Sequence, residues 1–292
     1  MNGENSRDTE FTGALKWRKI KNRDIPSVKT LLLAMEENYV SACARFLARN
    51  PLKDPAWALC TKDNKIAGLL VSSRSTLIPV LCERKDIPAP RFLGGVFRKK
   101  RIHSVQGLKE EVLIFADALE QTGKRSADIY DYDLMSLDSR PSQRRYSSGP
   151  DELILRVPQM TDIDEIAALQ AAYEQEEVIP SGSVFSPSAS RVNAVNIISG
   201  GQILAAQING KLVGKININA VSFTRYQVGG VYVRPDFRGH GIASRMAAEF
   251  TGSLISRGRG VTLFVKKSNI AARRLYSNLG FTVKGDYRIT YY

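Results

Sequence analysis

The sequence is short of the residue types that build metal centres, disulfides and covalent-nucleophile sites. It contains only two histidines, His103 and His240, which excludes a multi-histidine metal site and leaves few candidates for a Ser-His-Asp triad. Its three cysteines all lie before residue 83 and form no Cys-x-x-Cys pair. This usage is typical of a reduced chain, and we expect the protein to be cytoplasmic.

Long apolar runs are also missing. Residues 1–13 are polar and acidic, unlike a secretory signal peptide, and predict a flexible tail. No apolar run approaches the length of a membrane span, so no membrane partner is expected.

Acidic residues are outnumbered: 42 lysines and arginines stand against 29 aspartates and glutamates, a formal net charge of +13. The first 150 residues carry +8 of this charge and the rest +5, so the excess is spread along the chain. A basic balance of this kind suits a polyanionic ligand such as a nucleotide or coenzyme. The length of 292 residues and a hydrophobic fraction of 43% predict two packed domains.

The most informative stretch is Gly229–Met246, which reads GGVYVRPDFRGHGIASRM. Residues 231–233 alternate as a strand does, and helical spacing of apolar residues begins at Ile242. Between these two elements, glycines allow a tight turn, and the first turn of the helix offers unpaired N–H groups at the positive end of its dipole. Arg238 and Arg245 can pair with phosphate oxygens. The stretch therefore predicts a pyrophosphate-binding loop.

The order of predicted elements runs twice along the chain. Residues 139–150 are rich in Ser, Arg and Pro and predict a linker between a first domain at 14–138 and a second at 151–292. In the first domain we expect strands at 15–20, 57–61, 65–73, 77–82 and 129–137, with helices at 24–48 and 107–119, while prolines 88 and 90 break the chain. In the second we expect strands at 153–157, 202–208, 211–221, 226–233, 260–265 and 281–292, with a hairpin turn at Asn209–Gly210 between 202–208 and 211–221. We expect its first helix to begin at Thr161, which would cap it, and three further helices at 188–198, 242–257 and 268–279.

Two motifs in the second half match a known family. Arg238, Gly241 and Ala243 fit Gln/Arg-x-x-Gly-x-Gly/Ala, and Asn269–Phe281 fits Asn-x-x-Ala-x-x-Leu-Tyr followed by Leu-Gly-Phe. On these residues, 151–292 resembles the GCN5-related N-acetyltransferase (GNAT) superfamily. The resemblance implies an α/β (α+β) fold with a mixed central sheet flanked by helices.

The first half repeats the element order more faintly, and we interpret it as a degenerate GNAT-like domain, giving two such domains in tandem. Ile102–Leu108 stands where the phosphate loop is expected, but it has one glycine and lacks the motif spacing. We therefore expect no coenzyme there. An unrelated α/β domain is the alternative, because element order alone is weak evidence of kinship.

The resemblance implies acetyl-CoA (coenzyme A) as the acetyl donor. Residues 231–233 would hold the pantetheine arm like an added strand, and residues 239–243 would hold the pyrophosphate. The coenzyme-binding residues implied are Val231, Tyr232, Val233, Arg238, Gly239, His240, Gly241, Ile242, Ala243, Ser244, Asn269 and Ala272. His240 is included only as part of the loop, without a catalytic role.

The resemblance also places Tyr276 beside the acetyl sulfur as general acid, with a core aromatic as the alternative reading. Direct attack by an amine needs a base, and Glu176 and Glu177, at the end of the first helix of this half, are the candidates. A solvated acidic helix end and a water relay are the alternatives.

The predicted function is N-acetyl transfer to a primary amine of a small molecule or peptide, and the acceptor is left open. The acceptor-binding residues are expected in loops such as 178–190. The competing hypothesis is a non-catalytic acyl-CoA-binding sensor on the same fold. The basic run Arg98–Arg101 could bind RNA, but no aromatic residues alternate with it, so no nucleic-acid partner is expected. The oligomeric state is left open.

Overall fold

The computed structural model describes residues 15–82, 84, 86–98, 100–141, 150, 152–180 and 182–292. The predicted tail and most of the predicted linker lie outside these residues. The chain forms two compact units. The first contains the described residues up to Ala34 together with Ala48–Tyr130 and Arg288–Tyr292, and the second contains Met35–Leu47 and Asp131–Tyr287.

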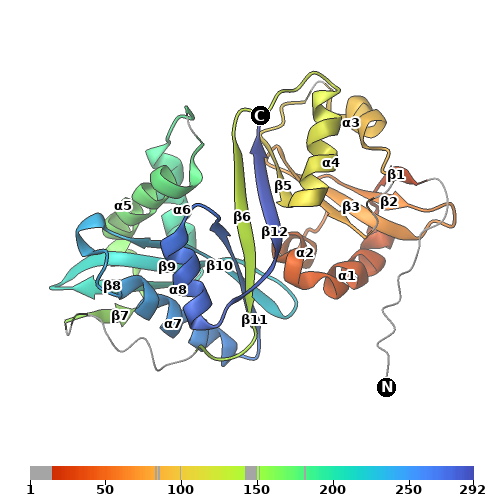
Figure 1. The fold of residues 1–292 in the computed structure, drawn as a ribbon. Coiled ribbons are helices and arrows are strands. Elements are labelled where there is room, and N and C mark those ends of the chain that lie inside the picture. The colour runs from red at the N-terminus through yellow and green to blue at the C-terminus, as the bar shows by residue number, and fades with distance from the viewer. Residues whose placement is uncertain are drawn as a thin grey trace. The chain divides into compact units, whose positions relative to one another are not determined.

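The same series of ten elements occurs twice: strand, two helices, three strands, helix, strand, helix, strand (Figure 1). The first series is β1 (Lys16–Lys19), α1 (Ile25–Ala34), α2 (Val40–Leu47), β2 (Ala56–Cys60), β3 (Ile66–Ser73), β4 (Thr76–Leu81), α3 (Ala89–Phe97), β5 (Ser104–Leu108), α4 (Lys109–Glu120) and β6 (Ile129–Leu137). The second series is β7 (Ile154–Arg156), α5 (Ile163–Tyr173), α6 (Pro187–Ser199), β8 (Ile203–Ile208), β9 (Lys211–Val221), β10 (Arg225–Val233), α7 (Ile242–Ile255), β11 (Gly260–Lys266), α8 (Ile270–Leu279) and β12 (Thr282–Tyr291).

An arginine–aspartate pair precedes the first long helix of each series. Asp24 binds both terminal nitrogens of Arg18, at 2.7 and 3.0 Å, and accepts from the Lys21 backbone N–H. Arg156 and Asp162 are also six positions apart and lie just before α5. Both terminal nitrogens of Arg156 donate to Asp162, each at 2.8 Å. The shared contact supports a common origin for the two series.

Other contacts show that the two units do not correspond to the first and second halves of the sequence. β6, the last strand of the first series, pairs antiparallel with β11 in the second unit. Near the chain end, Tyr291 exchanges backbone hydrogen bonds with Ala127 and Asp128 in the first unit. α2 packs on β9 and β10 in the second unit. The units therefore have different bounds from the expected division at 139–150.

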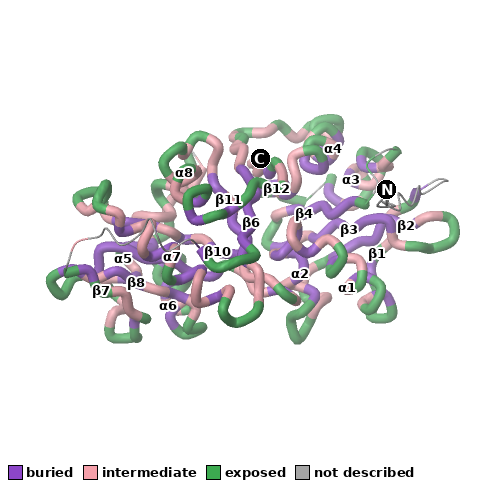
Figure 2. The backbone as a smooth tube through the Cα atoms, turned by 60° about the horizontal axis from the view of Figure 1, so that its bottom comes forward, coloured by how far each residue is buried: buried purple, intermediate pink, exposed green. Residues whose placement is uncertain are grey.

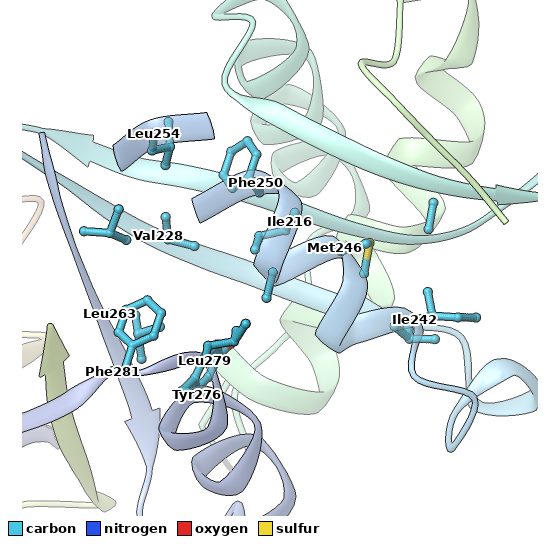
Figure 3. Packing of buried hydrophobic residues seen from close by; sticks show 14 of the residues in the cluster. Ile216, Val228, Ile242, Met246, Phe250, Leu254, Leu263, Tyr276, Leu279 and Phe281 are labelled. Carbon is cyan, nitrogen blue, oxygen red and sulfur yellow. The ribbon is translucent and has the colours of Figure 1, made fainter. Parts of the chain in front are cut away.

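The second unit is built on a mixed sheet with strand order β12-β6-β11-β10-β9-β8-β7, in which β10 and β11 run parallel. Side chains that alternate along a strand point to opposite faces. Ile216 and Ile218 accordingly join the core of α7 and α8, whereas Leu169 of α5 and Ala194 of α6 belong to a separate core. The core shown in Figure 3 includes Val228, Met246, Phe250, Leu263, Tyr276, Leu279 and Phe281.

The first unit holds strands in the order β1-β2-β3-β4-β5, with β4 and β5 parallel. Its core is rich in aromatic rings: Trp17 stacks on Phe92 with ring centroids 4.9 Å apart, and Trp57 meets Phe97 edge-on. Buried residues run along the strands, while exposed residues gather in turns and on outer helix faces (Figure 2). Such burial of aromatic surface is a dominant stabilising contribution in small domains.

Several sequence predictions need correction in the first series. The helix expected at 24–48 is broken between Ala34 and Val40 by a short 3-10 turn. The sequence analysis does not predict α3, because it treats prolines 88 and 90 as breaks in the chain. Pro90 in fact lies in the first turn of the helix, where the missing N–H has no partner to lose. Residues 104–108 form strand β5, so the counterpart of the phosphate loop is instead the β4–α3 connection at 82–88.

The second series agrees more closely with expectation. The predicted Asn209–Gly210 hairpin joins β8 to β9, and both residues have positive φ, as a type I′ turn requires. Thr161, predicted as the cap of α5, lies inside a 3-10 turn, and Asp162 accepts from the Gln159 backbone N–H at 2.7 Å.

Candidate active site

The parallel pairing between β10 and β11 ends partway along both strands. It runs from Arg225 opposite Gly260 to Val228 opposite Leu263. β11 continues to Lys266 in register with β6. The pairing of β10 with β11 therefore ends at Val228, and beyond it an extended ligand can take the place of a strand on this side of β10.

A β-bulge lies just beyond the point where this ladder ends. Gly229 pairs with Asn217 and Tyr232 pairs with Lys215, so two residues of β10 face one residue of β9. Gly230, one of the two, has φ of +61°. A Cβ at this position would lie 1.9 Å from Oδ1 of Asn217. The glycine is therefore required both by its backbone conformation and by the close approach of β9 side chains.

The predicted phosphate loop joins β10 to α7. Gly239 and Gly241 have φ of +83° and +74°, and Gly241 directly precedes the helix without a side-chain cap. The buried side chain of Ile242 anchors the first turn. Arg238 donates from Nε to the Val233 carbonyl at 2.9 Å and lies over the Tyr232 ring. This combination of an uncapped helix start and a held arginine fits a phosphate group.

Glu176 and Glu177 lie in a π-helical turn, Glu174–Val178, that continues α5. Glu176 forms an ion pair with Arg238, with Oε2 2.7 Å from Nη2. Glu177 lies 3.2 Å from Nζ of Lys266 and accepts from Asn269 Nδ2 at 3.4 Å. π-turns are frequent at functional sites, and this one brings both predicted bases into contact with residues predicted to hold coenzyme.

Asn269 caps the start of α8. Its Oδ1 accepts a hydrogen bond from the Ala272 backbone N–H at 3.0 Å, so its amide group remains the donor that reaches Glu177. The side chain of a capping asparagine is fixed by this bond. Two of the predicted coenzyme-binding residues are thus joined to each other directly.

Tyr276 lies on α8 and is only 6% exposed. Its ring meets Phe281 edge-on at 5.6 Å and belongs to the core shown in Figure 3. Burial raises the pKa of its phenol, and the nearby Tyr173 and Glu177 raise it further. The hydroxyl is therefore protonated throughout the physiological range, so its proton is present at this position.

Lys215 on β9 is a site residue that the sequence analysis missed. Its side chain is fully buried, and Nζ donates to the Gly230 carbonyl at 2.8 Å and to Asn217 Oδ1 at 2.9 Å. Burial lowers the pKa of this amine to about 7, partly offset by Glu174. The sequence does contain a signal for this residue. Lys215, Asn217 and Asn219 alternate along one strand, and the next strand contains the pair Gly229–Gly230.

The polar residues of β9 form a connected row. Asn217 donates to Asn219 Oδ1 at 2.9 Å, and Nζ of Lys215 lies 4.8 Å from the centre of the Tyr173 ring. Tyr173 also raises the pKa of Tyr276, so it acts on groups of both β9 and α8. Tyr173 is a second residue that the sequence analysis does not identify as part of the site.

The corresponding strands of the first unit, β4 and β5, also part early, since their parallel pairing runs from Thr76 opposite Ser104 to Leu77 opposite Val105. Glu111, on α4, is fully buried, and its Oε1 accepts from the Leu81 backbone N–H at the end of β4 at 3.0 Å. The β4–α3 connection at 82–88 contains no glycine. A buried carboxylate where an anionic coenzyme would approach opposes its binding.

A metal-binding cluster and a membrane-spanning helix are both absent from the part of the chain that the structure describes. Within it, no group of three or more His, Cys, Asp and Glu side chains is placed to hold a metal ion. No helix there combines the length and apolar character needed to cross a bilayer.

Comparison with known proteins agrees with this geometry. Residues 168–281 match the model of the Acetyltransferase (GNAT) family. The second half of the chain therefore carries a GNAT domain, as the sequence motifs predict. A sequence comparison with curated proteins finds no match.

Solved structures extend the likeness to nearly the whole chain. A GCN5-related N-acetyltransferase from Sphaerobacter thermophilus is 21% identical with a TM-score of 0.63, and 94% of each chain is covered. A tandem GNAT protein from the clavulanic acid biosynthesis pathway is 14% identical with a TM-score of 0.62, covering 94% of this chain and 97% of the other. A GNAT-family acetyltransferase from Colwellia psychrerythraea is 12% identical with a TM-score of 0.55, covering 95% and 100%. These likenesses confirm the predicted GNAT fold, including a tandem arrangement.

Proposed function

We propose that the protein is an acetyl-CoA-dependent N-acetyltransferase that transfers an acetyl group to a primary amine in a ternary complex. The observation that carries this proposal is the end of the β10–β11 ladder beside the glycine-rich start of α7. The family match at residues 168–281 supports an acyl-CoA-dependent acetyltransferase in general terms.

The coenzyme would supply an acetyl thioester, and the residues around β10 are suited to holding it. The first turn of α7 and Arg238 would bind the pyrophosphate through N–H groups and a guanidinium. The backbone of residues 231–233 would pair with the amides of the pantetheine arm. Asn269 would contact the same arm from α8. Holding the thioester and the amine together supplies much of the rate enhancement.

Three groups of the chain would carry the proton and charge changes. Glu176 or Glu177, directly or through water, would take the proton of the attacking amine. Backbone N–H groups at the β10 bulge would stabilise the developing negative charge on the thioester oxygen. Tyr276 would give its proton to the departing thiolate sulfur.

The test measures binding and turnover in the same preparation. Calorimetry with acetyl-CoA should give saturable binding, and release of free coenzyme A thiol should depend on an added amine from a panel of small amines, amino acids and peptides. Mass spectrometry of the products should show one acetyl group per molecule. No binding of acetyl-CoA would overturn the proposal.

An acyl-CoA-binding sensor is the second candidate, favoured by one observation. Both predicted bases already have cationic partners, Glu176 in Arg238 and Glu177 in Lys266. A sensor would bind acetyl-CoA with a rise in melting temperature and release no thiol with any amine of the panel. Amine-dependent thiol release would exclude it.

A further inference from the structure

The β10 bulge is held by a buried side chain from the neighbouring strand. Nζ of Lys215 donates to the carbonyl of Gly230, and the side chain itself is held by Asn217 and by the ring of Tyr173. In a regular ladder, a strand carbonyl points to the backbone of its neighbour. Gly230 is one of the two bulged residues of β10 and its carbonyl accepts from the Lys215 side chain, so its peptide group lies outside the regular ladder.

The geometry of that peptide determines where its N–H points. The peptide bonds of the described residues are trans. In a trans peptide, the carbonyl and the N–H that follows it point in opposite directions. The N–H of Val231 therefore points away from Lys215. This residue lies beyond Val228, where pairing with β11 has ended.

We propose that Lys215 is a positioning residue of the transfer site, which fixes and polarises the Gly230–Val231 peptide so that the Val231 N–H stabilises the thioester oxygen. The inference rests on the proposed function and names the donor within it. A cation on the carbonyl oxygen withdraws electron density from the amide, which strengthens the N–H as a donor. The Val231 N–H is held in position before the reaction, so the site needs no reorganisation when negative charge develops on the thioester oxygen.

The charge of Lys215 makes the effect dependent on pH. Tyr173 from α5 and Glu174 from the π-turn are the titratable groups that face its amine. With a pKa of about 7, the amine is charged at lower pH and polarises the peptide most strongly there. In the neutral form it retains two N–H donors, enough for Gly230 and Asn217, but exerts a weaker field.

The experiment compares Lys215→Met, Lys215→Gln and the wild-type chain. Lys215→Met should lower kcat by at least about 10-fold, less than the roughly 100- to 1,000-fold loss seen when a direct donor is removed, with the Kd for acetyl-CoA little changed. The infrared carbonyl band of bound ¹³C-labelled acetyl-CoA should shift in Lys215→Met toward its position in free coenzyme. The wild-type kcat should fall as the lysine loses its proton, and this limb of the pH profile should vanish in both variants.

Lys215→Gln separates holding from polarisation, because its amide can donate to Gly230 without a charge. Its kcat should lie between those of the wild type and Lys215→Met. If Lys215→Met does not fold, Lys215→Gln decides the question through its carbonyl band and pH profile. Lys211→Met removes an exposed lysine from the start of the same strand and should change none of these quantities.

Two outcomes would overturn the inference, and they are distinguishable. A wild-type chain that binds no acetyl-CoA removes the proposed function and the inference together. A wild type that binds and transfers, with kcat and carbonyl band unchanged in the folded variant, removes the inference alone.

Discussion

At the scale of single residues, the candidate site contains buried groups whose pKa values differ from those in water. Tyr276 and Lys215 are both almost fully enclosed, and burial disfavours the charged form of each. The phenol is thereby kept protonated, while the amine can be neutral near physiological pH. Each group leads to a separate prediction.

Replacing Tyr276 by Phe removes the proposed acid without changing ring packing. We expect kcat to fall about 100-fold or more, as is typical when a general acid is lost, and the Kd for acetyl-CoA to stay the same. Steady-state kinetics and calorimetry check the two quantities. Tyr287→Phe, at a buried tyrosine on β12, is the matched control. Unchanged turnover in Tyr276→Phe would assign the ring to the core alone.

Lys215 should also make the free energy of unfolding depend on pH. Its pKa falls from 10.5 in the unfolded chain to about 7 in the folded protein, so between these values the unfolded chain binds more protons and stability rises with pH. Below about pH 7 the lysine is charged in both the folded and the unfolded chain, so its contribution to stability no longer changes with pH. The folded protein then bears the full cost of burying the charged amine. The full window corresponds to roughly 4–5 kcal/mol as an upper bound.

Urea unfolding of wild type and Lys215→Met at pH 6.5, 8 and 9.5 measures this effect. The difference between them isolates Lys215 from tyrosines that titrate at higher pH. We expect the variant to gain stability relative to the wild type at pH 6.5, and this gain to shrink as pH rises. A difference that is constant with pH would contradict a lowered pKa.

At the scale of elements, the site joins the π-turn after α5 to the start of α7. The contact is the ion pair between Glu176 and Arg238. In the proposed complex, phosphate and carboxylate compete for the same guanidinium. Half-exposed pairs of this kind contribute little stability, so the phosphate can displace the carboxylate at small cost.

This competition predicts opposite effects for its two members. Arg238→Ala should weaken acetyl-CoA binding about 10-fold, because a charge-assisted hydrogen bond to phosphate is lost. Glu176→Gln should strengthen binding about two- to fivefold by releasing the arginine. Glu249→Gln removes an exposed carboxylate from α7 and controls for net charge. Calorimetry at one fixed salt concentration gives all three Kd values, and weaker binding in Glu176→Gln would contradict the competition.

At the scale of the whole molecule, two series of the same elements have diverged in one feature. The parallel ladder ends early in both series, after Val228 in β10 and after Leu77 in β4. The second has the glycine-rich start of α7, while the first has buried Glu111 against the end of β4. The Arg–Asp pair before α1 and α5 is common to both series. We therefore expect a coenzyme site in only one of the two units.

We expect one acetyl-CoA to bind per chain. Calorimetry of the full chain should give a stoichiometry of one, and Gly241→Val, which strains a position with φ of +74°, should abolish binding. Circular dichroism must show that this variant is folded. A second equivalent of bound coenzyme, or binding retained in a folded Gly241→Val chain, would mean that the first unit also holds a site.

Local patterns in the sequence were sufficient for most elements of the second half and for the glycine-rich loop before α7. The hairpin at Asn209–Gly210 and the end of α8 at Gly280 depend on residues adjacent in the chain, since each glycine adopts a positive φ that its neighbours require. The Arg238–Ala243 motif is equally local. The sequence by itself thus determined the fold class and the proposed donor.

Contacts between distant residues were decided only by the tertiary structure. No local pattern shows that β6 pairs with β11, that α2 packs in the second unit, or that Lys215 reaches Gly230 from another strand. The same holds for Glu176 and Arg238, which are 62 positions apart. These contacts depend on how strands align in space, so residues that look like an ordinary alternating strand become the support of the candidate site.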